Sequence, residues 1–244
     1  MARDRFIMCK FLTLFLLCIF TLTGCATYNY TKQGVHYEEK AGKIKTVAVM
    51  PIDFKFFQIS AGGVQEQMDE SAAEAKKFIK EALVAHLGDR NIQLNFVDEA
   101  SLKSTNKDTW FAQKGLYEAI ASTALTHAYP GINGFKDKID SFDYTMGEGI
   151  SALPQTSQAD ALLFIQGYDT ARTTGKVVMD AFIGALAGVY YYYFNPLNIG
   201  LVDPKTGDVL WFKTNNIMQE VDFRNAKAVD NLVKWLIEDL LIKK

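Results

Sequence analysis

The sequence predicts a single α/β domain with a mixed β-sheet flanked by helices. From residue 44 onward, strand-like segments alternate with segments of helical periodicity, and a strand–turn–strand unit followed by an amphipathic helix closes the chain. The composition agrees with a folded domain, since 49% of the 244 residues are hydrophobic and 22% are charged. We therefore expect a leader over residues 1–24, a flexible tether over residues 25–43 and the domain over residues 44–244.

The first 24 residues have the layout of an export signal. Arg3, Arg5 and Lys10 precede an apolar run over residues 11–20. A membrane-spanning helix needs roughly 20 apolar residues, so a permanent transmembrane anchor is the weaker interpretation. The leader is therefore predicted to be removed after export.

The end of the leader resembles the lipobox of bacterial lipoproteins. Leu-Thr-Gly-Cys over residues 22–25 places an apolar side chain and two small residues ahead of Cys25, whose sulfur would be acylated, for example with palmitate, before cleavage. The alternative is cleavage at Gly24 or nearby by the ordinary signal peptidase, without acylation. If two or three acyl chains are attached, membrane anchoring is effectively permanent.

Processing at Cys25 has two further consequences. It removes Cys9 and Cys18, so the exported domain has no disulfide and depends on an ordinary hydrophobic core. Ala26 stands where an aspartate would, by analogy with enteric lipoproteins, retain the protein at the inner membrane. The expected location is the periplasmic face of the outer membrane, with the inner membrane less favoured.

The first half of the mature chain predicts a strand and a helix after a polar segment. Residues 26–43 are polar and lack a sustained period, which is typical of a tether. Residues 44–52 form a β-branched run that predicts a buried strand. Residues 53–63 are predicted to be a loop, and the apolar spacing over residues 64–87 predicts a helix.

A second strand and helix follow, and then a long irregular segment. Residues 92–97 alternate between apolar and polar side chains, as a half-buried strand does, and residues 111–129 carry a helical stripe. Residues 130–158 are rich in glycine, proline and acidic side chains, so we expect a surface excursion. A calcium loop is disfavoured there because the spacing of ligands that such a loop requires is absent.

The last third of the chain predicts a strand, a hairpin and a helix. Residues 159–168 form a third strand, and residues 197–202 and 209–213 form a hairpin whose turn contains a proline and a glycine. A helix begins at about Asn225, and its apolar face must be covered by the domain.

Residues 177–194 are unusual because Asp180 is their only charge. The simplest interpretation is a core helix followed by a strand. A second is an apolar excursion that contacts lipid or another subunit, and a third is a buried span, which Asp180 and the short length oppose. The second interpretation predicts an interface in which tyrosine rings take apolar contacts and tyrosine hydroxyls stay in water, formed by Phe182, Ile183, Leu186, Tyr190, Tyr191, Tyr192 and Tyr193.

Catalytic and nucleic-acid-binding signatures are missing from the sequence. The 26 basic and 28 acidic side chains give no general positive field, so nucleic acid is not an expected partner. The metalloprotease, esterase-elbow and P-loop motifs are absent, and His36, His86 and His127 are isolated. We expect no catalytic residue, cofactor or metal site. The alternative is an envelope hydrolase that uses carboxylates at strand ends, namely Asp160, Asp169 and Asp203.

Three segments that follow the lipobox resemble a known superfamily. Val-Ala-Val-Met-Pro-Ile over residues 47–52, Ala-Asp-Ala-Leu-Leu-Phe over 159–164 and the hairpin over 200–212 are similar to segments of envelope lipoproteins that include curli-secretion-channel-like and penicillin-binding-protein-activator-like proteins. The resemblance covers residues 44–242. It implies a non-enzymatic periplasmic module that assembles or activates envelope proteins, with an envelope protein or a second copy as partner.

Residues 177–194 depart from that superfamily. Secretion channels that resemble it use transmembrane hairpins of alternating hydrophobicity, and this segment does not alternate. The leading hypothesis is a lipid-anchored binding, assembly or activator module. A subunit of an outer-membrane secretion complex remains an alternative, beside the hydrolase.

Overall fold

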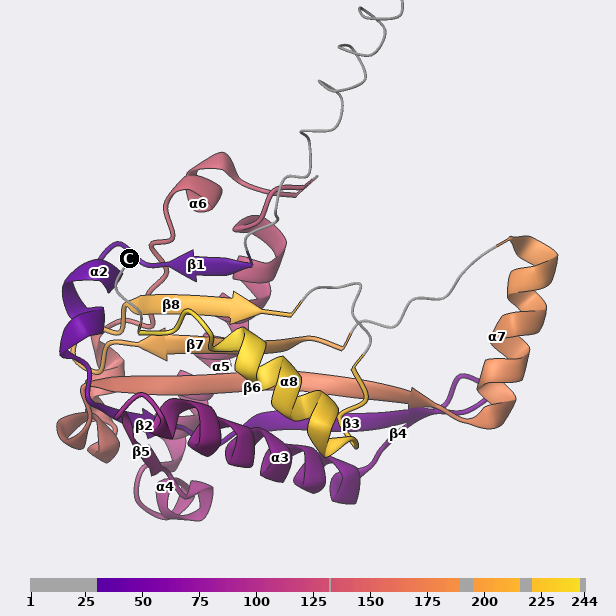
Figure 1. Ribbon diagram of the computed structural model, residues 1–244, viewed down its shortest axis with the longest axis horizontal. Helices are drawn as coiled ribbons and strands as arrows, with labels where there is room; N and C mark the ends of the chain where they lie inside the picture. The colour runs from indigo at the N-terminus through magenta and orange to yellow at the C-terminus, as the bar shows by residue number, and fades with distance from the viewer. Residues whose placement is uncertain (1–29, 132, 189–194, 216–220, 242–244) are drawn as a thin grey trace, which may run out of the picture.

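The chain folds into one mixed eight-stranded sheet with helices on both faces, which confirms the predicted fold class (Figure 1). The computed structural model describes residues 30–131, 133–188, 195–215 and 221–241. Outside these ranges lie the predicted signal peptide over residues 1–24, the predicted lipid attachment site Cys25 and the four predicted interface tyrosines over residues 190–193.

Strand β6 (Ala161–Arg172) is the central strand of the sheet. One of its edges pairs antiparallel with β7 (Leu197–Val202), while the other pairs in parallel first with β2 (Thr46–Val49) and then with β3 (Asp53–Ile59). The outer strands are β8 (Val209–Thr214) and β1 (Thr31–Gln33) on the β7 side, with β5 (Gln93–Phe96) beside β2 and β4 (Gln65–Gln67) beside β3.

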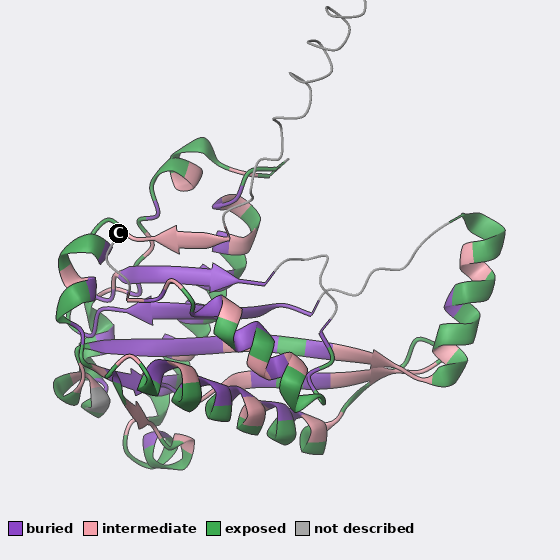
Figure 2. Cartoon of the chain, viewed as in Figure 1, coloured by how far each residue is buried: buried purple, intermediate pink, exposed green. Residues whose placement is uncertain are grey.

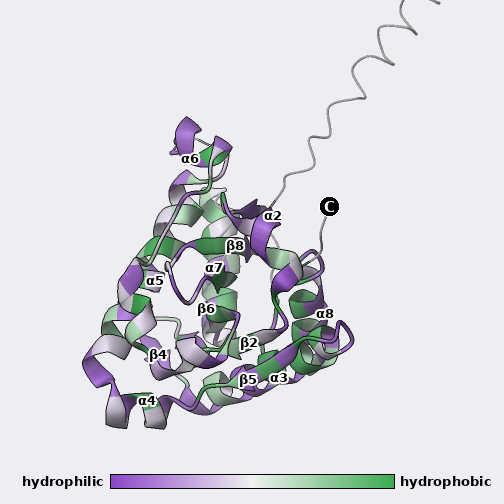
Figure 3. Ribbon diagram, turned by 90° about the vertical axis from the view of Figure 1, so that its left-hand side faces the viewer, coloured by the Kyte–Doolittle hydropathy of each residue, from purple (hydrophilic) through white to green (hydrophobic). Residues whose placement is uncertain are grey.

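Helices cover both faces of this sheet. The α-helices are α2 (Tyr37–Lys40), α3 (Asp69–Gly88), α4 (Glu99–Thr105), α5 (Lys107–His127), α6 (Lys136–Asp140), α7 (Thr174–Ala187) and α8 (Ala226–Leu236). Short 3-10 turns occur at η1 (Ala41–Lys43), η2 (Glu148–Ala152) and η3 (Pro154–Gln158). Figure 3, viewed along the strands, shows α3 and α8 on one side of the sheet and α5 on the other.

The alternation of side chains along β6 divides the core into two layers. Leu163 and Ile165 pack in the layer under α3 and α8, whereas Leu162 and Phe164 pack in the layer under α5. All four side chains are buried, as the purple first half of β6 shows in Figure 2. A run that is buried on both faces explains why this strand is apolar without alternation.

The strongest sequence patterns are confirmed. The strands predicted over residues 44–52, 92–97 and 159–168 are β2, β5 and β6, and the predicted hairpin is formed by β7 and β8. The terminal helix is also confirmed as α8. The side chain of Asn225 caps it by accepting hydrogen bonds from the backbone amides of Lys227 at 3.0 Å and Ala228 at 3.2 Å.

The hairpin turn is held by Asp203. Its Oδ1 accepts from the backbone amides of Lys205 at 2.8 Å and Thr206 at 3.0 Å, and Gly207 takes a φ of 78°. Burial would raise the pKa of Asp203, but the hydrogen bonds from Lys40 and from the two amides outweigh burial and lower the pKa. The carboxylate is therefore a turn former in its ionised state.

Two predicted element boundaries are wrong near the end of β2. Residues 53–63 are not all loop, because β3 pairs in parallel with the second half of β6. Its pattern alternates Phe54 and Phe56, which are buried, with exposed Lys55, but only a long-range partner makes it a strand. The helix predicted from residue 64 begins at Asp69, because the preceding residues form β4.

The predicted surface excursion over residues 130–158 is wrong in part. Phe142, Met146, Ile150 and Leu153 are buried and join the core layer under α5. These apolar residues do not recur with a helical or strand period, so sequence periodicity could not detect them.

The predicted tether over residues 25–43 is too long. From Thr31 onward the chain belongs to the domain, because β1 pairs antiparallel with β8 and the side chain of Tyr37 is fully buried. The segment is short and polar, and its contacts are to residues about 200 positions later in the chain, which no local pattern reveals.

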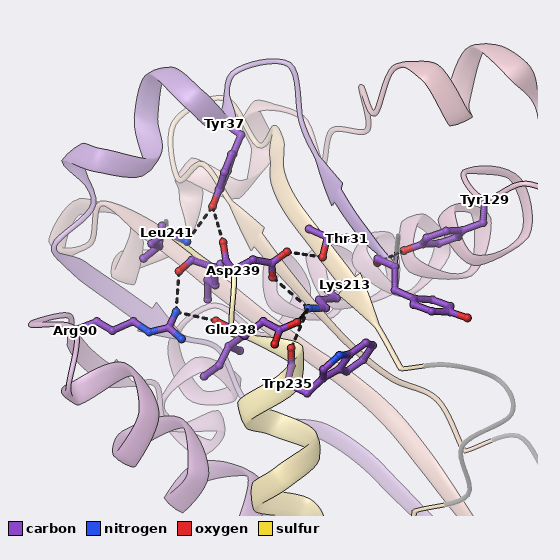
Figure 4. A network of polar contacts seen from close by, with 12 residues as sticks. Thr31, Tyr37, Arg90, Tyr129, Lys213, Trp235, Glu238, Asp239 and Leu241 are labelled. Atoms are coloured by element: carbon purple, nitrogen blue, oxygen red, sulfur yellow. Dashed lines mark hydrogen bonds and ion pairs between the residues drawn. The ribbon is translucent and has the colours of Figure 1, made fainter. Parts of the chain in front are cut away.

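A polar network joins the two ends of the domain (Figure 4). Thr31 Oγ1 donates to Asp239 Oδ2 at 2.6 Å, and the Tyr37 hydroxyl donates to the Asp239 carbonyl at 3.2 Å while accepting from the Leu241 amide at 2.9 Å. Burial raises the pKa of Tyr37 to about 12. The chain leaving α8 is thus fastened to the segment that enters the sheet as β1.

The same network surrounds a buried cation. Lys213 of β8 is 3% exposed, and its ammonium donates to the Trp235 carbonyl at 2.9 Å and to Glu238 Oε1 at 3.1 Å. It also contacts Asp239 Oδ1 at 3.3 Å and lies 4.5 Å from the centre of the Trp235 ring. Arg90, two residues after the end of α3, donates to the carbonyls of Ile237 and Leu240, so the C-terminal turn is held from both sides.

We expect Tyr37→Phe to lower the free energy of unfolding by about 1–3 kcal/mol, because the variant leaves the Leu241 amide without its acceptor. The folded pKa of about 12 exceeds the ordinary value of 10.0, so the stability that Tyr37 contributes is present below pH 10 and is lost as the pH rises toward 12. The advantage of the wild type should shrink over that range. Urea denaturation at several pH values measures it, with Tyr168→Phe, at a half-exposed tyrosine, as the control; an equal loss in both variants would contradict the role of the network.

Candidate functional site

On the β3 side the sheet continues beyond the end of β7 as an arm, which we define as β3, β4, residues 166–172 of β6, and α7. At the base of the arm, Phe54 and Phe56 of β3 still pack in the core layer under α3 and α8. Pairing of β6 with β7 ends at Gly167, whereas pairing with β3 continues to Arg172. Figure 1 shows α7 at the far end of this arm, away from α3, α5 and α8. The arm exists because β6 is longer than β7.

Helix α7 is placed by polar contacts at its first two turns. Thr173 caps it by accepting from the Lys176 amide at 3.3 Å, and Thr173 itself donates its backbone amide to the Ile59 carbonyl of β3 at 3.0 Å. Asp180 is 6% exposed and accepts from Lys176 Nζ at 2.5 Å, with Arg172 of β6 at 3.9 Å. The charged side of the helix therefore faces the arm.

The apolar side of α7 faces away from the domain. Phe182 is 62% exposed and Leu186 is 73% exposed, and Asp180 is the one buried residue of this helix. Ile183 is half-buried. The other exposed large apolar side chains of the helix are Val177, Val178 and Met179. A contiguous apolar surface of this kind on a folded domain usually marks an interaction site.

The simplest interpretation of residues 177–194, a core helix followed by a strand, is wrong for the helix. The helix starts where the sheet has already left its cover, and the ion pair of Asp180 with Lys176 turns the charged side inward. Residues 189–194, where the strand was expected, lie outside the described part of the chain. Among the described residues, no helix has both the length and the hydropathy that crossing a bilayer requires.

A groove of about 480 Å³ lies at the base of the arm. Its lining includes Glu118, Ser122 and Leu125 of α5 and Phe57 and Tyr168 of the arm. Below it, the buried Tyr117 hydroxyl donates to Asn198 Oδ1 at 3.2 Å, and burial raises the pKa of Tyr117 well above its ordinary value. A lining of mixed apolar and polar side chains suits the segment of a protein partner.

The three strand-end carboxylates do not form one site. Asp160 and Asp203 line a common hollow of about 250 Å³ together with Lys40 and Lys43, while Asp169 lies toward the other end of β6. Asp160 Oδ2 accepts from two backbone amides at 2.9 Å each, and Asp203 serves the hairpin turn. Because its pKa is lowered, Asp203 is a poor proton donor.

Asp169 is also engaged by the backbone. It is 4% exposed, its Oδ1 accepts from the Thr170 amide at 2.6 Å, and its Oδ2 accepts from the Phe223 amide at 3.2 Å. Burial raises its pKa, against the effect of both amides. The bond from Phe223 attaches the segment before α8 to the arm. Asp169 therefore has a structural role.

The histidines lie apart from one another. His86 and His127 are in the last turns of α3 and α5, where they contact Asp230 at 2.7 Å and the Asn133 carbonyl at 2.7 Å, and His36 is exposed. In the described part of the chain, no group of three or more His, Cys, Asp or Glu side chains could hold a metal ion.

Sequence reasoning identified the apolar segment but not its position in the fold. Phe182, Ile183 and Leu186 were expected as interface residues, and the structure brings them onto the same helix at the end of the arm. Phe57 and Tyr168 of the groove were missed, because residues 53–63 were predicted to be a loop. The alternation around Phe54 and Phe56 was the available signal.

Comparisons with known proteins give only distant similarity. No model of a known protein family matches the chain, and no curated protein sequence matches it either. Among solved structures, a PelC dodecamer from Paraburkholderia phytofirmans aligns with 88% of this chain and 96% of its own, at 10% identity and a TM-score of 0.35. The LpoB C-terminal domain from Salmonella enterica aligns with 75% and 96%, at 13% identity and a TM-score of 0.28. At these values the function has to be argued from the residues of this chain.

We expect Asp180→Asn to loosen α7 without unfolding the sheet. Removal of the buried negative charge weakens the contacts with Lys176 and Arg172 that hold the helix to the arm, so amide hydrogen exchange in α7 should accelerate by about 10- to 100-fold. The matched control is Glu81→Gln in the exposed Lys77–Glu81 pair, which has the same spacing along its helix. Exchange in α7 that equals the wild type would show that the ion pair does not hold the helix.

Proposed function

We propose that this protein is a lipid-anchored, non-enzymatic lipoprotein of the bacterial cell envelope, which uses α7 to engage another envelope component. Cys25 carries the acyl chains, and the domain faces the periplasm at the outer membrane. The observation that carries the proposal is the exposed apolar surface of α7, held at the end of the arm by a buried ion pair. Its task is the binding, assembly or activation of other envelope proteins or of its own oligomer.

The way in which α7 is held supports an interface. A helix with several large exposed apolar side chains would collapse onto the nearest apolar surface if nothing prevented it. Here the cap at Thr173, the Asp180 ion pair and the pairing of β3 with β6 hold α7 away from the domain. Phe182, Ile183 and Leu186 are thereby presented to a covering surface.

A binding function is favoured over catalysis because the candidate catalytic carboxylates already have structural hydrogen bonds. The strand-end carboxylates are acceptors for backbone amides, and the groove at the base of the arm is lined by both apolar and polar side chains. A groove of this kind suits the segment of a protein partner, so the arm offers two adjoining contact surfaces. The resemblance of the strand segments to envelope lipoproteins, including those of secretion complexes, supports the same proposal.

The lipid anchor predicts a specific mass at the mature N-terminus. Wild-type protein from membranes should begin at Cys25 and carry acyl chains, and Cys25→Ser should lack the acyl mass because the thiol that accepts the lipid is gone. Cys18→Ser, within the leader, is the control and should be acylated normally. Mass spectrometry of the intact N-terminal peptide measures this, and wild-type protein without acyl mass would overturn the anchor.

The engagement of α7 predicts protection of its surface in the envelope. In the processed protein an engineered Leu186→Cys supplies the one free thiol, because Cys25 is acylated. In permeabilised cells it should react several-fold more slowly with a membrane-impermeant maleimide than Val84→Cys, a 51% exposed apolar position on α3. Both thiols should react equally fast after detergent extraction. Equal rates before extraction would exclude α7 as an engaged surface.

A further inference from the structure

We infer that the component engaged by α7 is the lipid bilayer itself: α7 lies in the interface of the leaflet that holds the acylated Cys25, as a second membrane contact. This inference rests on the proposed function and names the component that α7 engages. A lipid surface, a second copy and an envelope protein are the three occupants to distinguish, and the first is favoured by distance and by chemistry.

The distance from the anchor to the domain is short. Six residue steps separate Cys25 from Thr31, where β1 starts, and an extended chain of that length spans about 20 Å. Because residues 31–43 belong to the domain, the predicted long tether is not available to carry the domain away from the membrane. The start of β1 is therefore held near the leaflet.

Strand register places α7 within reach of the same leaflet. Thr31 is level with Lys213, Ile199 and Ile165 across the sheet. Arg172 is seven residues farther along β6, about 23 Å, and three strand spacings away, about 14 Å. Figure 1 shows α7 rising from the end of β6 toward the level of β1. A single lipid surface can thus cover both the start of β1 and the outer side of α7.

The outer side of α7 has the chemistry of a lipid contact. Over residues 177–187 the only polar side chain is Asp180, which is buried against Lys176 and Arg172. No exposed charge or amide has to be dehydrated when the helix enters an apolar layer. Protein interfaces have about one hydrogen bond per 100–200 Å² and a polar rim, and this side offers no side chain for either.

The length of α7 fits a position in the interface. Fourteen residues of helix extend about 21 Å, which is short of the roughly 30 Å of a bilayer core. A short apolar helix whose first turns are attached to a folded domain can bury one side among the headgroups and upper acyl chains.

The test uses the processed, acylated full chain in vesicles of phosphatidylethanolamine and phosphatidylglycerol that contain doxyl-labelled phosphatidylcholine. An environment-sensitive fluorophore is attached to Leu186→Cys and, as the matched control, to Val84→Cys on α3. We expect doxyl lipids to quench the probe at position 186 and aqueous iodide to quench it several-fold less than the probe at position 84. Adding Phe182→Asp should restore iodide quenching at 186, because a charge then has to enter lipid, while Phe182→Leu should leave it unchanged.

The alternative outcomes each overturn the inference. If the probe at 186 is shielded from iodide but not quenched by doxyl lipids, a second copy covers α7. If it is open to iodide in vesicles although position 186 is protected in cells, an envelope protein covers α7, and the proposed function stands without the lipid contact. If it is open in both settings, the inference and the proposed function fail together.

Discussion

The shape of this molecule depends on the pairing of β6 with β3, which continues for five residues beyond the end of its pairing with β7. Over its first half, β6 is paired on both edges and buried on both faces, so it forms the centre of the core. After Gly167, only the pairing with β3 continues. The arm is therefore an extension of the central strand of the sheet, and it carries α7 away from the domain.

The second constraint is the junction of the chain ends. Lys213, buried under Trp235, together with Asp239 and Tyr37, joins β1 and β8 to the turn after α8. An edge strand of three residues would fray alone, since it has few hydrogen bonds of its own. With these contacts, the start of β1 is fixed relative to β6 and hence to α7. If Cys25 is anchored as we propose, a restraint on the start of β1 is transmitted to the sheet.

Much of the fold could be predicted from the sequence, because β2, β6, the hairpin and α8 carry strong local patterns. Asp203, which forms the hairpin turn, and Asn225, which caps α8, could be predicted because each bonds to residues next to it in the chain. The missed features depend on distant partners. Strand β3 forms only by pairing with β6, and β1 only by pairing with β8. Ile150 is buried only because it joins the core layer under α5. The exposure of α7 could not be predicted for the same reason. An apolar segment has the same composition whether it is buried in the core or exposed on the surface.

The buried Asp180 explains why α7 does not pack its apolar side onto the domain. Without a charge on its inner side, α7 would gain by packing onto Phe57 and Tyr168, which line the groove and are partly exposed. The carboxylate ties the helix to Lys176 and Arg172, so turning the apolar side inward would expose one ion pair and break its geometry. A single acid thus selects the outward orientation. The same acid leaves the outer side free of charge, which is the property that a lipid surface requires of a helix.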